Sequence, residues 1–412
     1  MKRVGMRPEN GHQARLLRLL RDGGPQSRAE LGEAVELSKS KVAIELDRLA
    51  ELGFVDVVGL AASRGGRRSQ MVALSSSLRF VGIDIGATSI DVAIMDGELR
   101  LLGHAAQPTD VRAGPNVVLD QVLDLVAKVR AELSGPAEEL SGVGVGVPGP
   151  VSQGAGALVA PPIMPGWSHF PIRDMLGAAL GAPVMVDNDV NIMALGELHA
   201  GTARSVRDLL FVKVGTGIGC GIVVGGEVYR GVTGAAGDIG HIQVDENGPV
   251  CTCGNIGCLE ACFGGAALAR DAEAAARSGR SARLADRLAE LGALSGSVDG
   301  GLKSGVLTAR DVGAAAAAGD PVAIQLVRQG GHRLGQVLAS LVSFFNPALL
   351  VIGGGVAAGL GHPLLAEIRS VVYRRSLPLA TGNLPIVLSE LGGTAGVVGA
   401  ARFVSDSVLN PI

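Results

Sequence analysis

The chain has 412 residues, of which 47% are hydrophobic and 18% charged, so it is not a disordered polypeptide, and its length favours two or three domains. The net charge of −3 is unevenly spread. Residues 1–80 carry 14 Lys/Arg against 9 Asp/Glu, a balance of +5, whereas the remainder carries 22 against 30, a balance of −8. A basic head on an acidic body indicates that the head meets a polyanion.

No apolar run is long enough to cross a bilayer, and residues 1–17 contain no apolar segment of the signal-peptide type. We therefore expect a cytoplasmic protein without a membrane partner. There are five cysteines, and three of them, Cys251, Cys253 and Cys258, are crowded together. In a reducing compartment this crowding indicates metal ligation rather than disulfide bonds.

Residues 1–74 are predicted to form a winged helix-turn-helix domain. Asn10 can cap a first helix, which residues 23–25 (Gly-Gly-Pro) end. Ser27 and Glu30 form a capping box for a second helix, and Ser38 caps a third. The apolar positions expected to face inward are Leu16, Leu17, Leu19, Leu20, Leu31, Val35, Val42, Leu46, Leu49 and Leu52.

Two short strands, Phe54–Val58 and Gln70–Leu74, are predicted after the helices, with a basic loop between them. The start of the third helix carries hydroxyls and cations suited to a major groove, and the loop suits phosphates or a minor groove. The residues expected to contact duplex DNA are Ser38, Lys39, Ser40, Lys41, Arg64, Arg67 and Arg68. The alternative is a helical protein-interaction module with a solvated charged loop. DNA binding is favoured because helix spacing, caps and basic loop agree.

The body is predicted to start after a short joint at residues 75–79 and to contain an internal repeat. Residues 80–94 read as a strand, a glycine turn and a second strand, and a similar unit begins 131 residues later, at residues 211–224. Further apolar runs alternate with helices, which is an α/β pattern with a mixed sheet in each half. These further runs are Gly142–Val147, Val184–Val186, Leu349–Ile352 and Ile386–Leu388. Two such lobes facing each other would form a cleft for a ligand. The lobes are expected at about residues 80–200 and 201–412.

Glycine turns are the candidate phosphate-binding elements. Asp84, Gly86 and Thr88 lie on the first predicted hairpin, where a carboxylate can hold Mg²⁺ and a turn can approach phosphate. The matching turn on the second hairpin is Gly215-Thr216-Gly217-Ile218-Gly219. The alternative is two ordinary hairpin turns, but their repetition favours a phosphate clamp. Gly354, after the strand at 349–352, is expected beside an adenine or ribose.

The run Asp187-Asn188-Asp189-Val190-Asn191 follows a strand and precedes a helix. Such clusters commonly serve as turns and helix caps. The functional alternative needs one carboxylate as general base for a hydroxyl and one amide to orient that hydroxyl.

The strongest local signal is the set His241, Cys251, Cys253 and Cys258, because three thiolates and one imidazole within eighteen residues are typical of a closed tetrahedral zinc site. A site with four protein ligands leaves no open position, so the zinc is expected to be structural. Cys220 and Cys262 lie outside this spacing and are expected to be small core residues.

Together these residues resemble the ROK family of repressors and sugar kinases. The residues that carry the resemblance are Asp84 to Thr88, Pro148-Gly149-Pro150, Asn188-Asp189, Gly215 to Gly219, Gly240-His241 and the run from Cys251 to Glu260. The resemblance implies an α/β body with the two-lobed actin-like (ribonuclease-H-like) ATPase fold over residues 80–412, preceded by the winged helix of the repressor branch. It also implies a dimer or tetramer on a near-palindromic operator.

The same resemblance implies roles for individual residues. Asp189 would be the general base that takes a proton from a sugar hydroxyl, while Asp84 and the Gly215–Gly219 turn would serve Mg-ATP. The residues implied to bind sugar are Gly149, Asn188, Asp238, His241 and Glu260. Asp238 departs from the family pattern, which has Glu there, and its carboxylate is set back by about 1.5 Å. This departure leaves the identity of the sugar and the kinase rate open.

Three functions follow as alternatives. The first is a regulator that binds a sugar and, in response, loses or gains affinity for its operator DNA. The second is an ATP-dependent hexose or amino-sugar kinase with a regulatory head, since Asp84 and Asp189 are both present. The third, a scaffold, leaves the cysteine cluster and the paired glycine turns without a role. The regulator is preferred because of the head.

Overall fold

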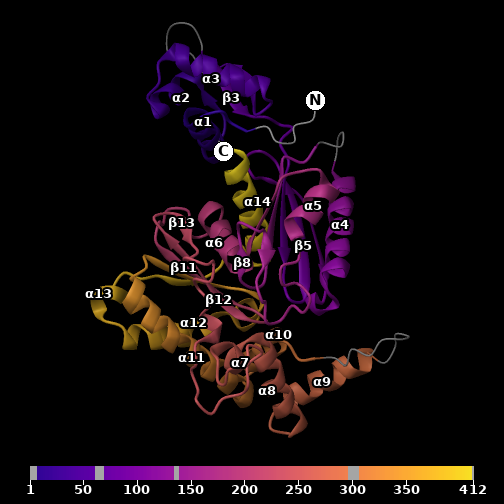
Figure 1. Cartoon of the computed structure of the whole chain (residues 1–412). Coiled ribbons are helices and arrows are strands. Elements are labelled where there is room, and N and C mark those ends of the chain that lie inside the picture. The colour runs from indigo at the N-terminus through magenta and orange to yellow at the C-terminus, as the bar shows by residue number, and fades with distance from the viewer. Residues whose placement is uncertain (1–6, 61–68, 134–138, 296–305, 411–412) are drawn as a thin grey trace. The chain divides into compact units, whose positions relative to one another are not determined.

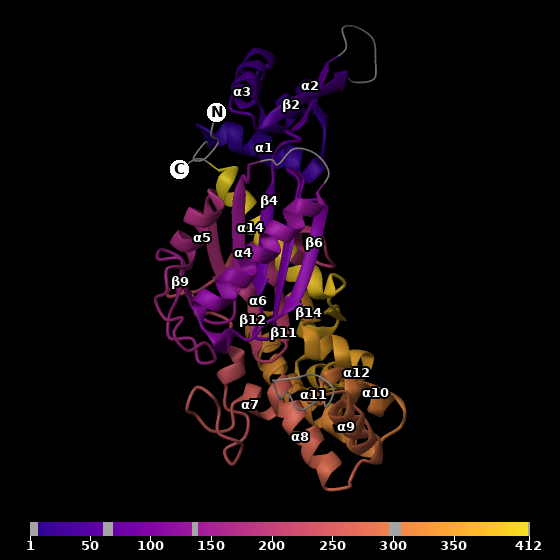
Figure 2. The same ribbon diagram turned by 90° about the vertical axis from the view of Figure 1, so that its right-hand side faces the viewer.

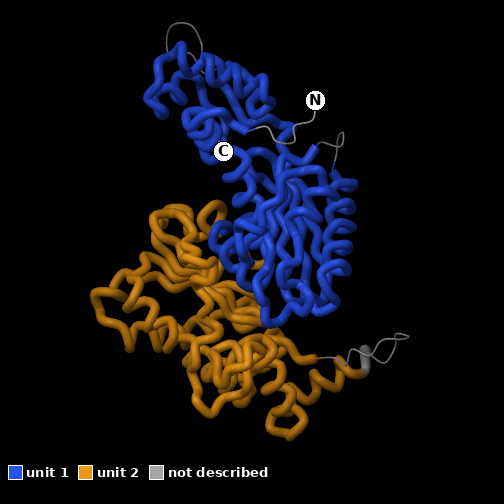
Figure 3. The backbone as a smooth tube through the Cα atoms, in the orientation of Figure 1, with its two compact units in different colours: residues 1–196, 396–412 blue, residues 197–395 orange. Residues whose placement is uncertain are grey.

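The computed structural model describes residues 7–60, 69–133, 139–295 and 306–410 (Figure 1). The chain forms two compact units, residues 1–196 with 396–412, and residues 197–395, and each unit is described by itself below (Figure 3). Three residues predicted to contact DNA, Arg64, Arg67 and Arg68, lie outside the described residues.

The head consists of three helices and a small antiparallel sheet, as predicted. Asn10 accepts hydrogen bonds from the backbone N–H groups of His12 and Gln13, and the Ser27/Glu30 capping box is formed. The third helix begins after Ser38, whose hydroxyl accepts from the Lys41 N–H at 3.4 Å. The elements are α1 (Gly11–Gly23), β1 (Gln26–Ser27), α2 (Arg28–Val35), α3 (Lys39–Glu51), β2 (Val55–Leu60) and β3 (Gln70–Leu74), in the sheet order β1-β3-β2.

The head is packed directly onto the C-terminal helix α14 (Ala395–Val408), which ends against α1 (Figure 2). Apolar side chains of α1, α2 and α3 share one buried cluster with Val397, Ala401, Val404 and Val408 of that helix. Leu78, in the predicted joint at residues 75–79, is 2% exposed and belongs to the same cluster. The joint is therefore anchored to the core through Leu78, while Ser76 beside it is exposed.

The first body sheet lies in unit 1 and has the strand order β10-β7-β4-β5-β6. Strand β4 pairs antiparallel with β5 and parallel with β7, which makes the mixed sheet that the sequence predicts. Its elements are β4 (Phe80–Ile85), β5 (Ser89–Met95), β6 (Leu101–Pro108), α4 (Pro115–Glu132), β7 (Gly142–Val147), α5 (Ile172–Leu180), β10 (Val184–Asn188) and α6 (Asp189–His199). A minor ribbon, β8 (Val151–Ser152) with β9 (Ala157–Leu158), lies between β7 and α5 in the chain.

The second sheet, in unit 2, repeats this topology with the order β13-β12-β11-β14-β15. A three-strand antiparallel meander is again extended by two parallel strands on the side of its first strand. The strands are β11 (Leu209–Val214), β12 (Ile218–Val224), β13 (Glu227–Tyr229), β14 (Leu349–Gly353) and β15 (Ile386–Leu388). The internal repeat read from two glycine turns is thus confirmed at the level of whole sheets.

Helices provide the rest of unit 2. The region 264–345 contains α8 (Gly265–Arg277), α9 (Ala282–Ser295), α10 (Ala309–Ala317) and α11 (Pro321–Phe345). The remaining helices are α7 (Leu259–Phe263), α12 (Gly355–Arg375) and α13 (Pro378–Thr381). No helix in the described ranges has the length and apolar character of a membrane span.

Helix α14 lies on sheet 1, although the sequence-based division assigns residues 201–412 to the second lobe. A Cβ on Gly82 would stand 1.9 Å from the Val397 carbonyl oxygen, and one on Gly144 would stand 1.8 Å from that of Ala400. Successive strand residues face opposite sides of a sheet, so α14 covers the glycine face and α4 packs on the other. The glycines of β4 and β7 allow this close approach, which places the C-terminus in unit 1.

Candidate functional site

The first group of predicted site residues lies at the β4–β5 turn of unit 1. Asp84 is on β4, and the Gly86 N–H donates to the Ser89 carbonyl at 2.8 Å, which closes the turn. A Cβ on Gly396 would stand 2.0 Å from Asp84 Oδ2, so the carboxylate lies against the start of α14. Thr88 is exposed beside it. The turn thus presents a carboxylate, a hydroxyl and backbone N–H groups at one edge of the sheet.

The Asp187–Asn191 run leaves the same edge of that sheet and enters α6. The Asn188 side chain accepts from the Val190 N–H at 2.9 Å and donates to the Gly149 carbonyl at 3.0 Å. This is the helix-capping role that the pattern alone allowed, and it also draws the predicted sugar-binding residues Gly149 and Asn188 together. Asp189 follows as the first residue of α6 and is only 4% exposed.

Asp187 is a residue to which sequence reasoning gave no role. Its buried carboxylate accepts from the Asn188 N–H at 2.8 Å, from the Asn191 amide at 3.1 Å and from Gln153 at 3.4 Å. These bonds hold the β10–α6 turn in place around Asp189. The signal was present in the sequence as the first carboxylate of the run, but local pattern does not say that this carboxylate accepts the hydrogen bonds that close the turn.

The second glycine turn, in unit 2, is built around a carboxylate. The Ile218 N–H donates to Glu260 Oε2 at 3.1 Å, and a Cβ on Gly217 would stand 2.3 Å from that oxygen. Burial raises the pKa of the Glu260 carboxyl. The predicted sugar-binding Glu260 and the predicted phosphate turn therefore lie against each other.

Two helix N-termini reach the same turn. The Gly265 N–H, at the start of α8, donates to the Gly215 carbonyl at 2.8 Å. A Cβ on Gly354, before α12, would stand 2.6 Å from the Val214 carbonyl oxygen. Helix N-termini favour anions because of their free N–H groups and dipole. Lys213, on β11, also lies beside Gly215, a cation that sequence reasoning did not single out.

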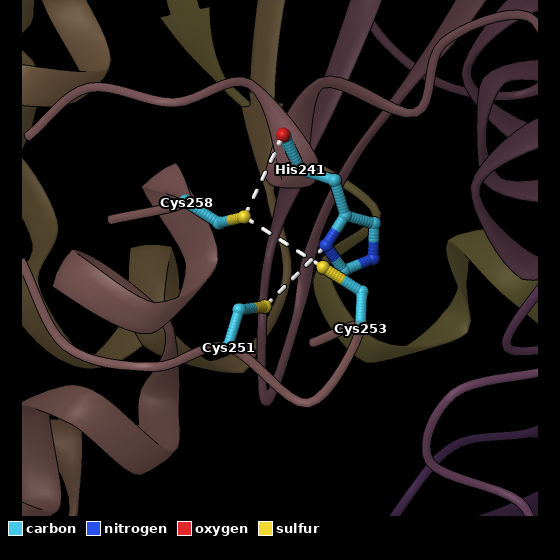
Figure 4. A group of neighbouring side chains, drawn as sticks. All are labelled: His241, Cys251, Cys253 and Cys258. Carbon is cyan, nitrogen blue, oxygen red and sulfur yellow. Dashed lines mark hydrogen bonds between the residues drawn. The ribbon is translucent and has the colours of Figure 1, made fainter. Parts of the chain in front are cut away.

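The four predicted metal ligands come together in unit 2 (Figure 4). Their ligand atoms all lie within 4.8 Å of one another. The Cys251 sulfur is 3.5 Å from His241 Nδ1, and the sulfurs of Cys253 and Cys258 are 3.7 Å apart. This cluster could hold a metal ion. Cys220 is 3% exposed, and burial raises the pKa of its thiol to about 12, as expected of an inert core residue.

The two ring nitrogens of His241 face different groups. Nδ1 points to the cysteines, whereas Nε2 is 3.9 Å from a carboxylate oxygen of Asp238. This distance is too long for a direct hydrogen bond. One histidine can thus ligate a metal on one side and present the other nitrogen to a ligand, as the sequence prediction for both roles requires.

The predicted DNA-contacting residues Ser38, Lys39, Ser40 and Lys41 are all exposed at the start of α3. The hydroxyls of Ser38 and Ser40 are 3.2 Å apart. Neither lysine has an ion-pair partner among the residues that the structure describes. Their ammonium groups are therefore available to an external anion.

Comparison with known proteins gives the same family over most of the chain. The profile of the ROK family matches residues 80–407. A xylose repressor from Caldicellulosiruptor bescii is 28% identical over 396 residues, covering 96% of this chain and 95% of the repressor. A glucokinase from Halalkalibacterium halodurans is 34% identical over 328 residues, covering 79% of this chain and 95% of the glucokinase.

Among solved structures, a crystal structure described as a ROK family transcriptional regulator, homologous to the MLC protein of E. coli, is similar over 96% of both chains. The TM-score is 0.77 and the sequence identity 25%. The similarity therefore extends over the head as well as the body, and the α/β fold expected from the sequence is confirmed.

Proposed function

The chain belongs to the ROK family, and on this premise we propose that it is a sugar-responsive, DNA-binding transcription regulator that acts as a repressor. One observation carries the proposal: a xylose repressor and a regulator structure match 96% of this chain, whereas the glucokinase matches 79%. The family profile begins at residue 80, after the head. The match to the repressors therefore includes the head, in addition to the body that this chain also shares with the glucokinase.

The contacts within the head support binding to duplex DNA. Helix α3 begins with exposed hydroxyls and two lysines, and it follows α2 after a three-residue turn, as the second helix of a helix-turn-helix does. The lysines would contact phosphates, and the helix start would enter the major groove. A homodimer or homotetramer on a near-palindromic operator would present two or more heads at once.

The body supports binding of a neutral sugar. In unit 1, the Asn188 amide is hydrogen-bonded to the Gly149 carbonyl, and the Asp189 carboxylate follows at the start of α6. In unit 2, His241 Nε2, Glu260 and Asp238 supply a ring nitrogen and two carboxylates. A pentose or hexose needs donors and acceptors of these kinds, because each buried hydroxyl must be hydrogen-bonded. The names of the relatives make xylose and glucose the first candidates.

We also infer that the cysteine cluster binds a structural zinc ion. In a tetrahedral site with Zn–S bonds of about 2.3 Å and Zn–N bonds of about 2.0 Å, two sulfurs are about 3.8 Å apart and a sulfur and nitrogen about 3.6 Å apart. The distances of 3.7 and 3.5 Å found here fit these values. Three thiolates and one imidazole complete the coordination, so the ion would stabilise the loop rather than activate water.

The test measures binding to duplex fragments from upstream of the protein's own gene by fluorescence anisotropy, with and without xylose, glucose and N-acetylglucosamine. We expect salt-dependent binding that one of these sugars weakens. Lys41→Ala should weaken binding and reduce the salt dependence by about one counterion. Lys128→Ala, on the exposed side of α4, is the matched control and should leave binding unchanged. Absence of binding to every fragment at low salt would refute the proposal.

The second candidate is an ATP-dependent sugar kinase, favoured by the Gly215 turn beside two helix N-termini and by the presence of Asp84 and Asp189. Here Asp84 would hold Mg²⁺, and Asp189 would accept the hydroxyl proton while the sugar oxygen attacks the γ-phosphate of ATP. Purified protein with Mg-ATP and each sugar is assayed for ADP release. Turnover that is abolished in Asp189→Asn but retained in Asp120→Asn, an exposed carboxylate on α4, would establish the enzyme. Sugar-dependent DNA binding without turnover would establish the regulator alone.

A further inference from the structure

Helix α3 has a solvent-exposed face, and the charged side chains at its two ends differ in whether they form ion pairs within the head. Val42, Leu46 and Leu49 are buried against the head, so the opposite side of the helix is free. Toward its end, Asp47 pairs with Arg28 at 2.8 Å, and Arg48 pairs with Glu9 and Glu51 at 2.7 and 2.9 Å. These charges are engaged within the head. The first turns of the helix, by contrast, carry the two lysines that have no ion-pair partner in the described part of the chain.

Ile44 is exposed on the same helix, just after the two lysines. It stands one turn after Ser40 and Lys41, and residues three and four apart on a helix are neighbours on its surface. Its side chain is 67% exposed, among the most exposed large hydrophobic side chains of the head. A branched hydrocarbon cannot hydrogen-bond to a phosphate or to a base edge. What it can contact favourably is another apolar group.

The major-groove edges of DNA offer one such group, the C5-methyl of thymine. We propose that Ile44 is a specificity residue that packs on a thymine methyl in the operator, while Lys39 and Lys41 hold the helix by phosphate contacts. The inference rests on the proposed DNA-binding function and adds the base that the helix reads. Free positive charge one turn before an exposed apolar side chain matches a groove with phosphate rims and a methyl-bearing floor.

The test replaces each thymine of a bound operator half-site by deoxyuridine, which removes only the methyl group. Burial of one such group contributes about 0.8 kcal/mol, so we expect about fourfold weaker binding at one or two positions and no change elsewhere. Ile44→Ala should bind the thymine operator more weakly than the wild type and should not respond to the deoxyuridine change at those positions. Replacing such a thymine by cytosine should weaken binding of the wild type, and 5-methylcytosine at that same position should recover part of the affinity.

Leu101→Ala is the matched control, because Leu101 is 55% exposed on β6 of the body and its loss should leave the response to deoxyuridine intact. Circular dichroism should give the same melting temperature for both variants and the wild type, since neither side chain is in the core. Wild-type binding that is indifferent to every deoxyuridine substitution, or an Ile44→Ala variant as sensitive as the wild type, would overturn the inference. In both of these cases DNA binding itself persists, so the outcome is distinct from failure of the proposed function, in which no duplex is bound.

Discussion

At the scale of single residues, the unit 2 site depends on two glycines, which have no side chain. Gly217 and Gly240 leave the space that the Glu260 side chain and the Ile218 carbonyl occupy. A methyl group at Gly217 would stand 2.3 Å from the Glu260 carboxylate, and one at Gly240 would stand 2.2 Å from the Ile218 oxygen. Glycine is therefore required at these two positions because neighbouring atoms pack closely there, and not only because of the turn conformation.

We predict that Gly217→Ala displaces the Glu260 carboxylate and weakens sugar binding. Loss of one hydrogen bond to a charged group costs about 1.5–3 kcal/mol, which corresponds to a loss of affinity of about tenfold or more. Isothermal titration calorimetry with the active sugar measures it. Gly292→Ala, at an exposed position of α9 where a methyl group meets nothing, is the control and should bind as the wild type does. Equal affinities for the two variants would argue against a sugar contact by Glu260.

We predict that Cys253→Ser releases the metal. Serine is a poor zinc ligand, and Cys253 is only partly buried, so the substitution removes a ligand without leaving a large cavity. Zinc per chain, measured by mass spectrometry after purification without chelator, should fall from about one ion to well under half. The melting temperature should fall with it. Cys220→Ala, which removes a buried sulfur outside the cluster, should lower stability but keep its zinc.

At the scale of elements, α14 is the helix whose position decides the architecture of unit 1. It crosses Gly82 and Gly144 on one side, and on the other a Cβ at its own Gly399 would stand 1.6 Å from the Ile192 carbonyl of α6. The helix that begins with Asp189 is thus packed against the helix that reaches the head. Close backbone contact of this kind leaves no room for a shift of one element alone.

We predict that Gly144→Ala is severely destabilising, because its Cβ would overlap the Ala400 backbone, which cannot rotate away. The cost of such overpacking is about 3 kcal/mol or more. Gly103→Ala is the control on the same sheet, since its nearest neighbours at 3.0 and 3.1 Å are side-chain atoms of Val129 and Leu133 that can move. Urea unfolding followed by circular dichroism compares the two. Equal midpoints would mean that α14 is not held at this distance.

At the scale of the whole molecule, the chain passes between its units within α6 and again at the start of α14. The first crossing follows Asp189 and the second precedes the helix that holds the head. The head is joined to α14 by a buried ion pair as well as by apolar packing. Arg21, with no exposed side-chain area, donates to Asp406 at 2.7 Å and to Ser405 at 3.3 Å, while Arg402 donates to Asp22 at 3.0 Å.

We predict that Arg21→Met loosens the head from the body. The substitution removes the charge-assisted hydrogen bonds of Arg21, but Asp406 is 35% exposed and keeps its pair with Arg402 at 2.9 Å, so we expect a cost of about 1–2 kcal/mol. Hydrogen exchange should rise in α1 and at the end of α14, while β11 and β14 of unit 2 stay protected. Arg112→Met removes an exposed pair with Asp110 and should change neither exchange nor melting temperature. An Arg21→Met protein with unchanged exchange in α1 would show that the apolar contacts suffice.

Much of the local structure was predictable because its causes are local. Asn10, Ser27 and Ser38 cap helices through backbone groups two or three residues away. The metal ligands fall within eighteen residues, so their spacing alone indicated a cluster. What local pattern could not supply was the inward turn of Asp187 or the approach of Lys213 to the glycine turn.

The amino-acid sequence by itself determined the caps, the two glycine-turned hairpins, the cysteine cluster and the basic start of α3, because each depends on residues close in the chain. The tertiary structure alone decided that the C-terminal helix belongs with the first sheet, that Arg21 pairs with Asp406, 385 residues away, and that Leu78 of the joint at 75–79 is buried. Such contacts depend on close backbone packing at glycines and on charged groups that are removed from water. Both arise only when segments far apart in the sequence pack together.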